Sequence, residues 1–269
     1  MRQRSNRFLT ALAATAAVSL MAATAAMAAT IVGDAGPNVL TGTEQRDRIF
    51  ALAGDDTVNA LGAADLVRAG QGADTVDAGR GRDRVHGGAG NDNLNGGAGC
   101  DHVFGGADDD TIDGGPGFSY RRFRCERLHG GLGNDLSSGG VGRDFMSGGR
   151  GDDRQSGGPG ADKIFANPGR DHSDGGEGHD VLWALARVDV TAIGDPEGDE
   201  LSGAAGRDLF LVRDGEVDLV HCGEDRDRVI ADQFDQVDND CERVIRRDIT
   251  SLDQVEDEEE NRTENPSLD

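Results

Sequence analysis

The chain has 269 residues, a net charge of −24 at pH 7, 42 glycines and only 4% aromatic residues. A surface this acidic repels nucleic acid and anionic membranes and attracts cations, so we expect neither of those two partners. The low aromatic content also argues against a large conventional core.

Residues 1–28 have the order of a secretory signal peptide. Arginines lie within residues 1–7, an alanine-rich apolar stretch covers 8–26, and Ala26-Met27-Ala28 offers a small-x-small cleavage site. A transmembrane anchor is the alternative, but the alanine-rich stretch is only weakly hydrophobic. We therefore expect a secreted protein, outside the cell or at its surface, with no membrane span in the mature chain.

A nine-residue repeat begins at residue 33 and continues without a slip into the block that starts at 114. Asp fills the sixth place of most blocks, and an aliphatic residue fills the eighth place as far as Ile112. After an insertion predicted at 118–129, the register resumes at 130 and runs to 183, with fewer apolar residues at the eighth place. The sixth-place aspartates of the two arrays are Asp47, Asp56, Asp65, Asp74, Asp83, Asp92, Asp101, Asp110, Asp135, Asp144, Asp153, Asp162, Asp171 and Asp180.

Each block predicts one turn followed by one short strand. Its first six positions are rich in Gly, Asp and Asn, which favour turns, and its last three suit a strand whose middle side chain faces inward. A single block cannot bury its side chain alone, so the blocks must stack, two to a coil. We therefore predict an all-β fold, a parallel β-solenoid or β-roll, over residues 29–183.

Stacking aligns each turn with the turn two blocks later. Asp74, Asp92 and Asp110 then share one edge of the roll, and Asp83 and Asp101 share the opposite edge. Carboxylates interleaved with turn carbonyls suit Ca²⁺, which accepts about six to eight oxygens in flexible geometry, better than they suit Mg²⁺. The sequence therefore predicts calcium ions between the coils.

The blocks GGAGNDNLN at 87–95 and GGAGCDHVF at 96–104 resemble the GGxGxDxUx nonapeptide of the RTX (hemolysin-type) calcium-binding repeats. This resemblance implies a right-handed parallel β-roll with Ca²⁺ between successive turns. It also implies a ligand set of turn carbonyls and sixth-place carboxylates, assisted by fifth-place side chains. These ligands are Asp56, Asp74, Asp83, Asp92, Asp101, Asp110, Asp135, Asp144, Asp153, Asp162, Asp171 and Asp180, with Asn91, Asp109, Asn134 and Asp152 at the fifth place.

Some blocks depart from this pattern. Gln45, Ala63 and Asp108 stand where the fourth-place glycine belongs, which makes their turns weaker candidates for calcium. Ser119 replaces the sixth-place Asp at the end of the first array. The N-terminal signal peptide and the cysteines also differ from the usual members, so we do not infer their one-step export route or a toxin role.

Four cysteines in an exported chain predict two disulfides. Three pairings are open from the sequence, and we favour the local one, Cys100 with Cys125 and Cys222 with Cys241. Stacking places the turn that bears Cys100 on the same edge as the start of the insertion that bears Cys125. Each second cysteine also opens a similar phrase, CERL in the first case and CERV in the second.

The remaining segments are less regular. The insertion at 118–129 joins aromatic residues with arginines, and it is either a ligand-binding loop or, as we favour, a clip over the side of the roll. Residues 184–246 contain short alternating stretches and predict a β-rich segment that caps the last coil. Residues 247–269 are acidic, lack aromatic side chains and predict a disordered tail.

The motifs of several enzyme classes are missing, including the HExxH zinc helix, the GxSxG elbow and the GxxxxGK[ST] phosphate loop. Scattered histidines are better explained as exposed turn or edge residues than as zinc ligands. We expect a non-enzymatic, secreted calcium-binding β-roll that folds on Ca²⁺ and has a structural, adhesive or matrix role, with a cell-surface or matrix partner. The alternatives are an accessory or remnant domain of an exported hydrolase or toxin-like protein, and an ice-binding solenoid, which would need regular Thr-x-Thr ranks.

Overall fold

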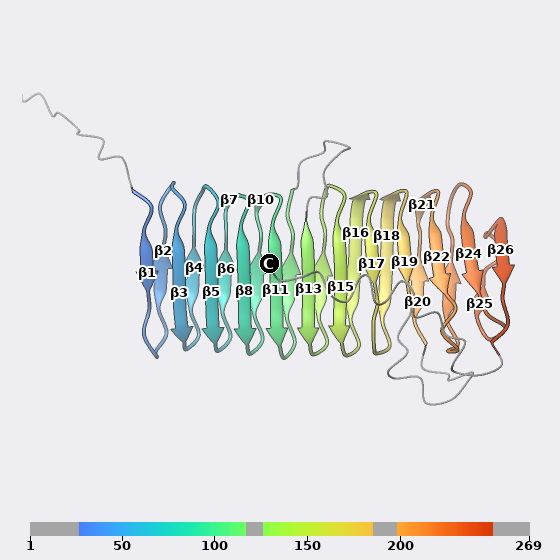
Figure 1. The fold of residues 1–269 in the computed structure, drawn as a ribbon, viewed down its shortest axis with the longest axis horizontal. Helices are drawn as coiled ribbons and strands as arrows, with labels where there is room; N and C mark the ends of the chain where they lie inside the picture. The colour runs from blue at the N-terminus through green and yellow to red at the C-terminus, as the bar shows by residue number, and fades with distance from the viewer. Residues whose placement is uncertain (1–26, 117–125, 185–197, 250–269) are drawn as a thin grey trace, which may run out of the picture.

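The computed structural model describes residues 27–116, 126–184 and 198–249. Within these segments all regular secondary structure is β-strand, and the strands of both large sheets pair in parallel. Figure 1 shows the coils following one another along the long axis of the molecule, from β1 at one end to β26 at the other. The predicted fold class, an all-β parallel β-solenoid, is confirmed.

Two 12-stranded sheets form the two broad faces of the roll. The first sheet contains β1 (Thr30–Val32), β3 (Arg48–Ala53), β5 (Leu66–Gln71), β8 (Arg84–Ala89), β11 (His102–Ala107), β13 (Arg127–Leu132), β15 (Phe145–Arg150), β17 (Lys163–Phe165), β19 (Val181–Trp183), β22 (Leu209–Val212), β24 (Arg228–Ala231) and β26 (Arg243–Arg246).

The second sheet alternates with the first along the chain, so each coil contributes one strand to each face. It contains β2 (Val39–Thr41), β4 (Thr57–Asn59), β6 (Thr75–Asp77), β9 (Asn93–Asn95), β12 (Thr111–Asp113), β14 (Leu136–Ser138), β16 (Arg154–Gly160), β18 (His172–Gly178), β20 (Glu200–Ser202), β23 (Leu219–His221) and β25 (Gln236–Val237), with β21 (Ala205–Gly206) beside β18. A short separate pair joins β7 (Arg80–Gly81) to β10 (Ala98–Gly99).

The eighth-place side chains build the core. Val67 pairs with Val85 across an interval of one coil, and Val85 pairs with Val103, so identical positions stack in rows. Side chains from the two sheets meet between the faces, where Val85 and Leu94 are fully buried. The alternation of buried and exposed positions in each strand follows from the two-residue period of β-structure.

The polar residues at the eighth place of the second array form a column inside the core. Ser137, Gln155 and Ser173 pair in register on the second sheet, and all three are buried. The Gln155 amide and the Ser173 hydroxyl are hydrogen-bonded at 3.2 Å, which offsets part of the cost of their burial. The facing column on the first sheet stays apolar, with Met146 and Ile164 fully buried.

Two predicted boundaries are corrected by the strand pairing. The insertion was predicted at 118–129, but β13 begins at Arg127 and pairs with β11 and β15, so residues 126–129 belong to the roll. The roll was predicted to end at residue 183 before a cap at 184–246. Strands β20 to β26 instead extend the same two sheets, because β19 pairs with β22 and β18 with β20.

Other predicted segments lie outside the described residues. These are residues 1–26 of the signal peptide, most of the insertion, and the acidic tail from residue 250. In the parts of the chain that the structure describes, no helix is long and apolar enough to cross a membrane.

Candidate metal-binding edges

The sixth-place carboxylates form two ladders, one along each edge of the roll. The backbone N–H of a sixth-place residue donates to the side-chain carboxylate of the next coil: Asp74 N lies 2.8 Å from Asp92 Oδ1, and Asp92 N lies 2.9 Å from Asp110 Oδ1. A buried N–H must find an acceptor, and here the next coil supplies it. The columns predicted from the repeat are therefore present in the structure.

The ladders extend beyond the predicted residues. The first ladder contains Asp56, Asp74, Asp92, Asp110, Asp135, Asp153, Asp171, Asp199, Asp218 and Asp235. The second ladder contains Asp47, Asp65, Asp83, Asp101, Glu126, Asp144, Asp162, Asp180, Asp208, Asp227 and Glu242.

The second oxygen of most ladder carboxylates is buried and has no hydrogen-bond partner among the described residues. The residues concerned are Asp56, Asp65, Asp74, Asp83, Asp92, Asp101, Asp110, Glu126, Asp135, Asp144, Asp153, Asp162, Asp180, Asp199, Asp208, Asp218 and Asp227. Burying a neutral polar group without a hydrogen bond costs about 2–7 kcal/mol, and burying an ionised carboxylate without a partner costs more. Rows of such oxygens therefore fit a bound cation, or protons where no cation is present.

Burial also perturbs the acidity of these groups. It raises the pKa of Asp83 to about 7 and that of Asp92 to about 6, while the hydrogen bond from the preceding coil acts in the opposite direction and neighbouring ladder charges raise both values further. Glu126 is affected most, because burial and the charges of nearby aspartates raise its pKa to about 9. A divalent cation placed along the ladder would offset these effects and favour the ionised carboxylates.

First-place glycines make room for the second oxygens. A Cβ at Gly87 would collide with Oδ2 of Asp92, and it would lie 2.7 Å from the carbonyl oxygen of Gly105 in the next coil. The carboxylate oxygen and a backbone carbonyl oxygen thus approach the same small space. Oxygen-only surroundings of this kind match the ligand preference of Ca²⁺.

The departures at the fourth place have different structural outcomes. Ala63 and Asp108 adopt φ values of 75° and 76°, so their turns keep the left-handed backbone that glycine normally supplies. The turn of Gln45 differs, because Thr43 donates its N–H and its hydroxyl to Asp47 Oδ2, while Ala29 N donates to Oδ1. Both oxygens of Asp47 are therefore occupied, and this turn is the weakest calcium candidate of the second ladder.

The fifth-place side chains lie beside the first ladder at exposed positions. Asp109 Oδ1 accepts the N–H of Asn134, and Asn134 Oδ1 accepts the N–H of Asp152, both at 2.8 Å. These bonds form a short outer ladder that supports the turns. Asn91 is also exposed. The predicted metal role of Asn91 and Asn134 thus stays a prediction.

Two glutamates belong to the second ladder, and the first of them fills the place where Ser119 had suggested a gap. Asp101 N donates to Glu126 Oε2 at 2.6 Å, so Glu126 rather than Ser119 continues the ladder beyond the insertion. Glu242 plays the same part for Asp227 N at 2.9 Å. Both glutamates follow a cysteine in the phrases CERL and CERV, and that repetition is the sequence feature that identifies them.

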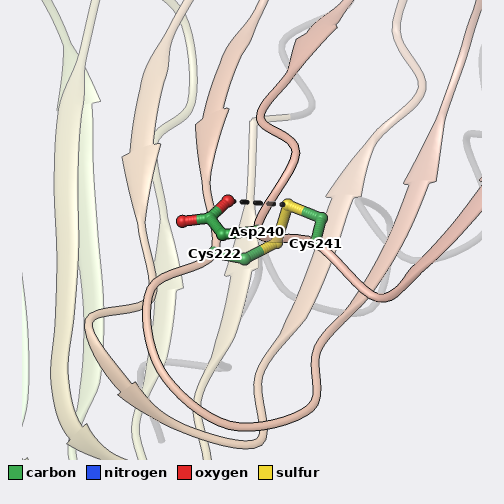
Figure 2. A group of neighbouring side chains, drawn as sticks. All are labelled: Cys222, Asp240 and Cys241. Atoms are coloured by element: carbon green, nitrogen blue, oxygen red, sulfur yellow. Dashed lines mark hydrogen bonds between the residues drawn. A yellow bond between two sulfur atoms is a disulfide. The ribbon is translucent and has the colours of Figure 1, made fainter.

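One predicted disulfide is present, and it joins neighbouring coils near the C-terminal end of the roll. Cys222, directly after β23, bonds to Cys241 beyond β25, with the Cα atoms 5.2 Å apart (Figure 2). Asp240 lies beside this bridge, but both sulfurs are committed to the disulfide, so the group is not a thiolate metal site. Cys125, the predicted partner of Cys100, lies outside the described residues, and that pairing stays a prediction.

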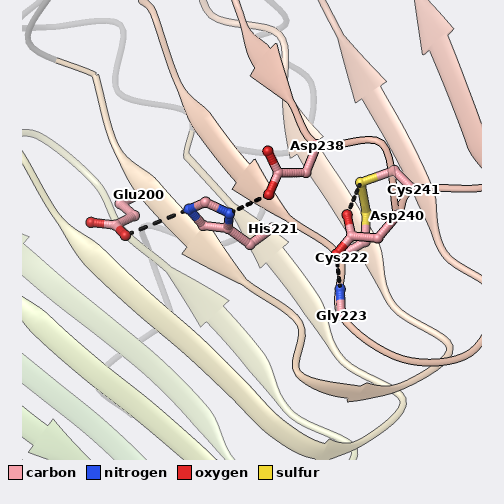
Figure 3. Close-up of polar contacts among 7 residues, drawn as sticks. All are labelled: Glu200, His221, Cys222, Gly223, Asp238, Asp240 and Cys241. Atoms are coloured by element: carbon pink, nitrogen blue, oxygen red, sulfur yellow. Dashed lines mark hydrogen bonds and ion pairs between the residues drawn. A yellow bond between two sulfur atoms is a disulfide. The ribbon is translucent and has the colours of Figure 1, made fainter.

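Two histidines, His172 and His221, lie on the outer face of the second sheet, and His221 is next to this bridge. Figure 3 shows His221 between two carboxylates, with Nδ1 at 2.7 Å from Asp238 and Nε2 at 3.6 Å from Glu200. Glu200 also approaches Nδ1 of His172 at 3.3 Å. These contacts connect adjacent coils from outside and fit the predicted surface role of the histidines.

Comparison with known families agrees with the geometry. The family model of the RTX calcium-binding nonapeptide repeat matches residues 32–67, 59–94, 68–101, 86–119, 129–158 and 147–182. Among curated proteins, none matches the sequence. The matched ranges cover both arrays, whereas the ladder residues from Asp199 onward lie outside them.

Proposed function

Because the chain belongs to the RTX calcium-binding nonapeptide-repeat family, we propose that it is a secreted calcium-binding β-roll that folds when Ca²⁺ binds and serves a structural, adhesive or matrix role. The matched repeats are calcium-binding structural units, and we propose no catalytic activity. One observation carries the proposal: the rows of buried carboxylate oxygens that lack a hydrogen-bond partner in the described chain.

The ligands we propose are the second oxygens of the ladder carboxylates and the turn carbonyls beside them. Asp92 illustrates the arrangement, since one of its oxygens holds the preceding coil and the other faces the glycine-lined space of its own turn. Ca²⁺ tolerates the irregular oxygen set that such turns offer, whereas Mg²⁺ requires a near-ideal octahedron. When bound, calcium supplies the positive charge that the buried ladders otherwise lack.

The expected gain in stability is large. At about 1 mM Ca²⁺ and a Kd of about 0.1 mM, typical of extracellular modules, each site contributes about 1.4 kcal/mol. Six independent sites would contribute about 8 kcal/mol, which is comparable with the whole stability of an ordinary domain. Calcium can therefore decide whether the roll is folded.

The direct test uses the mature chain from residue 29. Far-ultraviolet circular dichroism should show little strand structure in chelator and a cooperative gain of strand signal as Ca²⁺ rises to millimolar levels. Mg²⁺ at the same concentration serves as the control and should be much less effective. A strand signal that is the same in chelator and in calcium would refute calcium-dependent folding.

Export is supported by the N-terminal segment and by the Cys222–Cys241 disulfide, a bond typical of oxidising compartments. N-terminal sequencing of the protein recovered from the culture medium tests it, with cleavage after Ala28 as the expected result. Recovery only from the cell interior, with residues 1–28 retained, would contradict secretion.

The outer face of the first sheet supports an adhesive role. His86 and Phe104, both half-buried, stack on it between coils at 4.9 Å, and the exposed Arg68 lies over Phe50. Aromatic and basic side chains stacked in this way suit contact with an extended partner at a cell surface or matrix. A pull-down from cell-surface and matrix material should retain a partner in calcium and release it in chelator. Equal retention in both conditions would count against calcium-dependent adhesion.

A further inference from the structure

A second kind of acidic site lies in the turn between β22 and β23, outside the residues matched by the repeat family. Asp214, Glu216 and Asp218 each offer one carboxylate oxygen there, and these oxygens all lie within 4.8 Å of one another. All three residues are buried. The ladder interval at this turn is 19 residues instead of the regular 18, and the longer turn brings Glu216 into the edge of the roll.

Backbone hydrogen bonds hold this turn in place. Asp214 Oδ1 accepts the N–H of Glu216 at 3.0 Å, and Asp218 Oδ1 accepts the N–H of Asp199 at 2.8 Å. Gly215 N donates to Asp232 in the following turn at 3.0 Å. The aspartates are therefore oriented by one oxygen, as in the regular ladders, while Glu216 is an addition that no regular block contains.

Asp199 from the preceding coil provides an independent observation. Its side chain is 2% exposed, and its Oδ2 has no hydrogen-bond partner among the described residues. Burial raises the pKa of Asp199, the charge of Asp171 raises it further, and the charges of Asp214 and Glu216 add to this effect. Asp199 is joined to this turn by the hydrogen bond from its N–H to Asp218 Oδ1, so its unpartnered oxygen lies on the coil beside the acidic turn. Within the turn itself, Asp218 Oδ2 is also buried and has no partner among the described residues.

We propose that Asp214, Glu216 and Asp218, together with Asp199, bind one divalent cation, Ca²⁺, at a site of different construction from the repeat turns. The regular edge sites draw carboxylates from equivalent turns of successive coils, whereas this site takes three from a single turn. A purely oxygen ligand set with this much negative charge selects a hard cation. Glu216 belongs to neither ladder, so its removal tests this site alone.

The experiment counts the calcium ions bound to the mature chain by native mass spectrometry and equilibrium dialysis. Glu216→Gln keeps the size of the side chain and should bind one ion fewer than the parent protein, or bind that ion at least tenfold more weakly. Glu224→Gln is the matched control, because Glu224 is exposed and lies in the next turn. An unchanged ion count and affinity in Glu216→Gln would overturn the proposal.

Hydrogen exchange of the parent protein gives a second readout that does not depend on a variant. Calcium should slow exchange in a peptide covering residues 213–218, with an apparent affinity that differs from that of the regular turns. Exchange there that follows the regular turns at every calcium concentration would overturn the proposal. A parent protein that binds a single ion, lost in Glu216→Gln, would support this site while refuting calcium binding at the ladders.

Discussion

Replacing Asp92 by Asn should weaken the calcium sites on either side of it while keeping the hydrogen-bonded ladder. Asp92 Oδ1 accepts the N–H of Asp74 at 2.8 Å, and an Asn carbonyl can accept the same bond. Oδ2 is buried without a partner among the described residues, and Asn replaces this oxygen by an NH₂ group, which is a hydrogen-bond donor and cannot bind a cation. Asp92→Asn therefore separates the two roles of one carboxylate.

The size of the effect follows from the position of Asp92 between Asp74 and Asp110 in the first ladder. Its carboxylate borders the space on either side, so two calcium sites should be weakened. With about 1.4 kcal/mol per site at 1 mM Ca²⁺, the loss amounts to about 3 kcal/mol of calcium-dependent stability. The slope of unfolding free energy against the logarithm of calcium concentration reports how many ions are bound on folding. In Asp92→Asn this slope should fall by the amount that corresponds to two ions.

Asp47→Asn is the matched control. Both oxygens of Asp47 already accept hydrogen bonds from Ala29 and Thr43, so this variant should lose about 1 kcal/mol at every calcium concentration and keep the parent slope. Urea unfolding of the parent and both variants gives the slopes when it is measured between about 0.1 and 10 mM Ca²⁺. The salt concentration is kept at roughly 150 mM, where exposed charges are screened beyond about 8 Å. Equal slope losses in Asp92→Asn and Asp47→Asn would mean that net charge, and not the geometry of the turn, binds the metal.

Three further predictions concern the bridge, the insertion and pH. Changing Cys222 and Cys241 together to Ser should lower the unfolding free energy by about 3 kcal/mol, because the bridge closes a loop of 19 residues; an unchanged denaturant midpoint would contradict this. Glu126→Ala leaves the buried N–H of Asp101 without its acceptor and should cost about 1–3 kcal/mol in calcium, whereas Glu126→Gln should lose mainly calcium affinity; equal losses would refute the ladder role. The pKa of Asp83 is about 7 in the folded state, and its ordinary value, which applies to the unfolded chain, is 3.8. The folded state therefore binds a proton more readily than the unfolded chain, so acid should favour folding when chelator has removed calcium. Strand signal measured in chelator should then increase as pH falls from about 7 toward 4, while calcium affinity declines over the same range; a chelated protein that loses strand structure on acidification would contradict this sign.

The sequence predicted the regular part of the roll because its pattern encodes every geometric step. The interval of nine residues sets one turn and one strand, and the interval of 18 places Asp74 N beside Asp92 Oδ1. Val67, Val85 and Val103 could be placed in one row for the same reason. Sequence reasoning succeeds here because the contacts are local in the stack and identical from coil to coil.

The sequence analysis did not predict the coils after Trp183, because the number of residues between ladder carboxylates changes there while the ladder hydrogen bonds continue. The ladder steps from Asp180 to Asp208 across 28 residues and from Asp208 to Asp227 across 19, so no fixed period connects them. Glu126 was missed for a related reason, since the insertion delays the sixth place and a longer side chain fills it. A repeat whose turns vary in length is hard to recognise in the sequence, although its strands still stack in the structure.

The regular interval of 18 residues also makes the roll a spacer of adjustable length. Removal or duplication of one whole coil between Asp56 and Asp110 gives every ladder N–H another aspartate and every core side chain another aliphatic neighbour. No turn, edge or core position has to be redesigned. Each coil lengthens the molecule by about 4.8 Å, the distance between neighbouring strands, so the span between its two ends is set by counting coils.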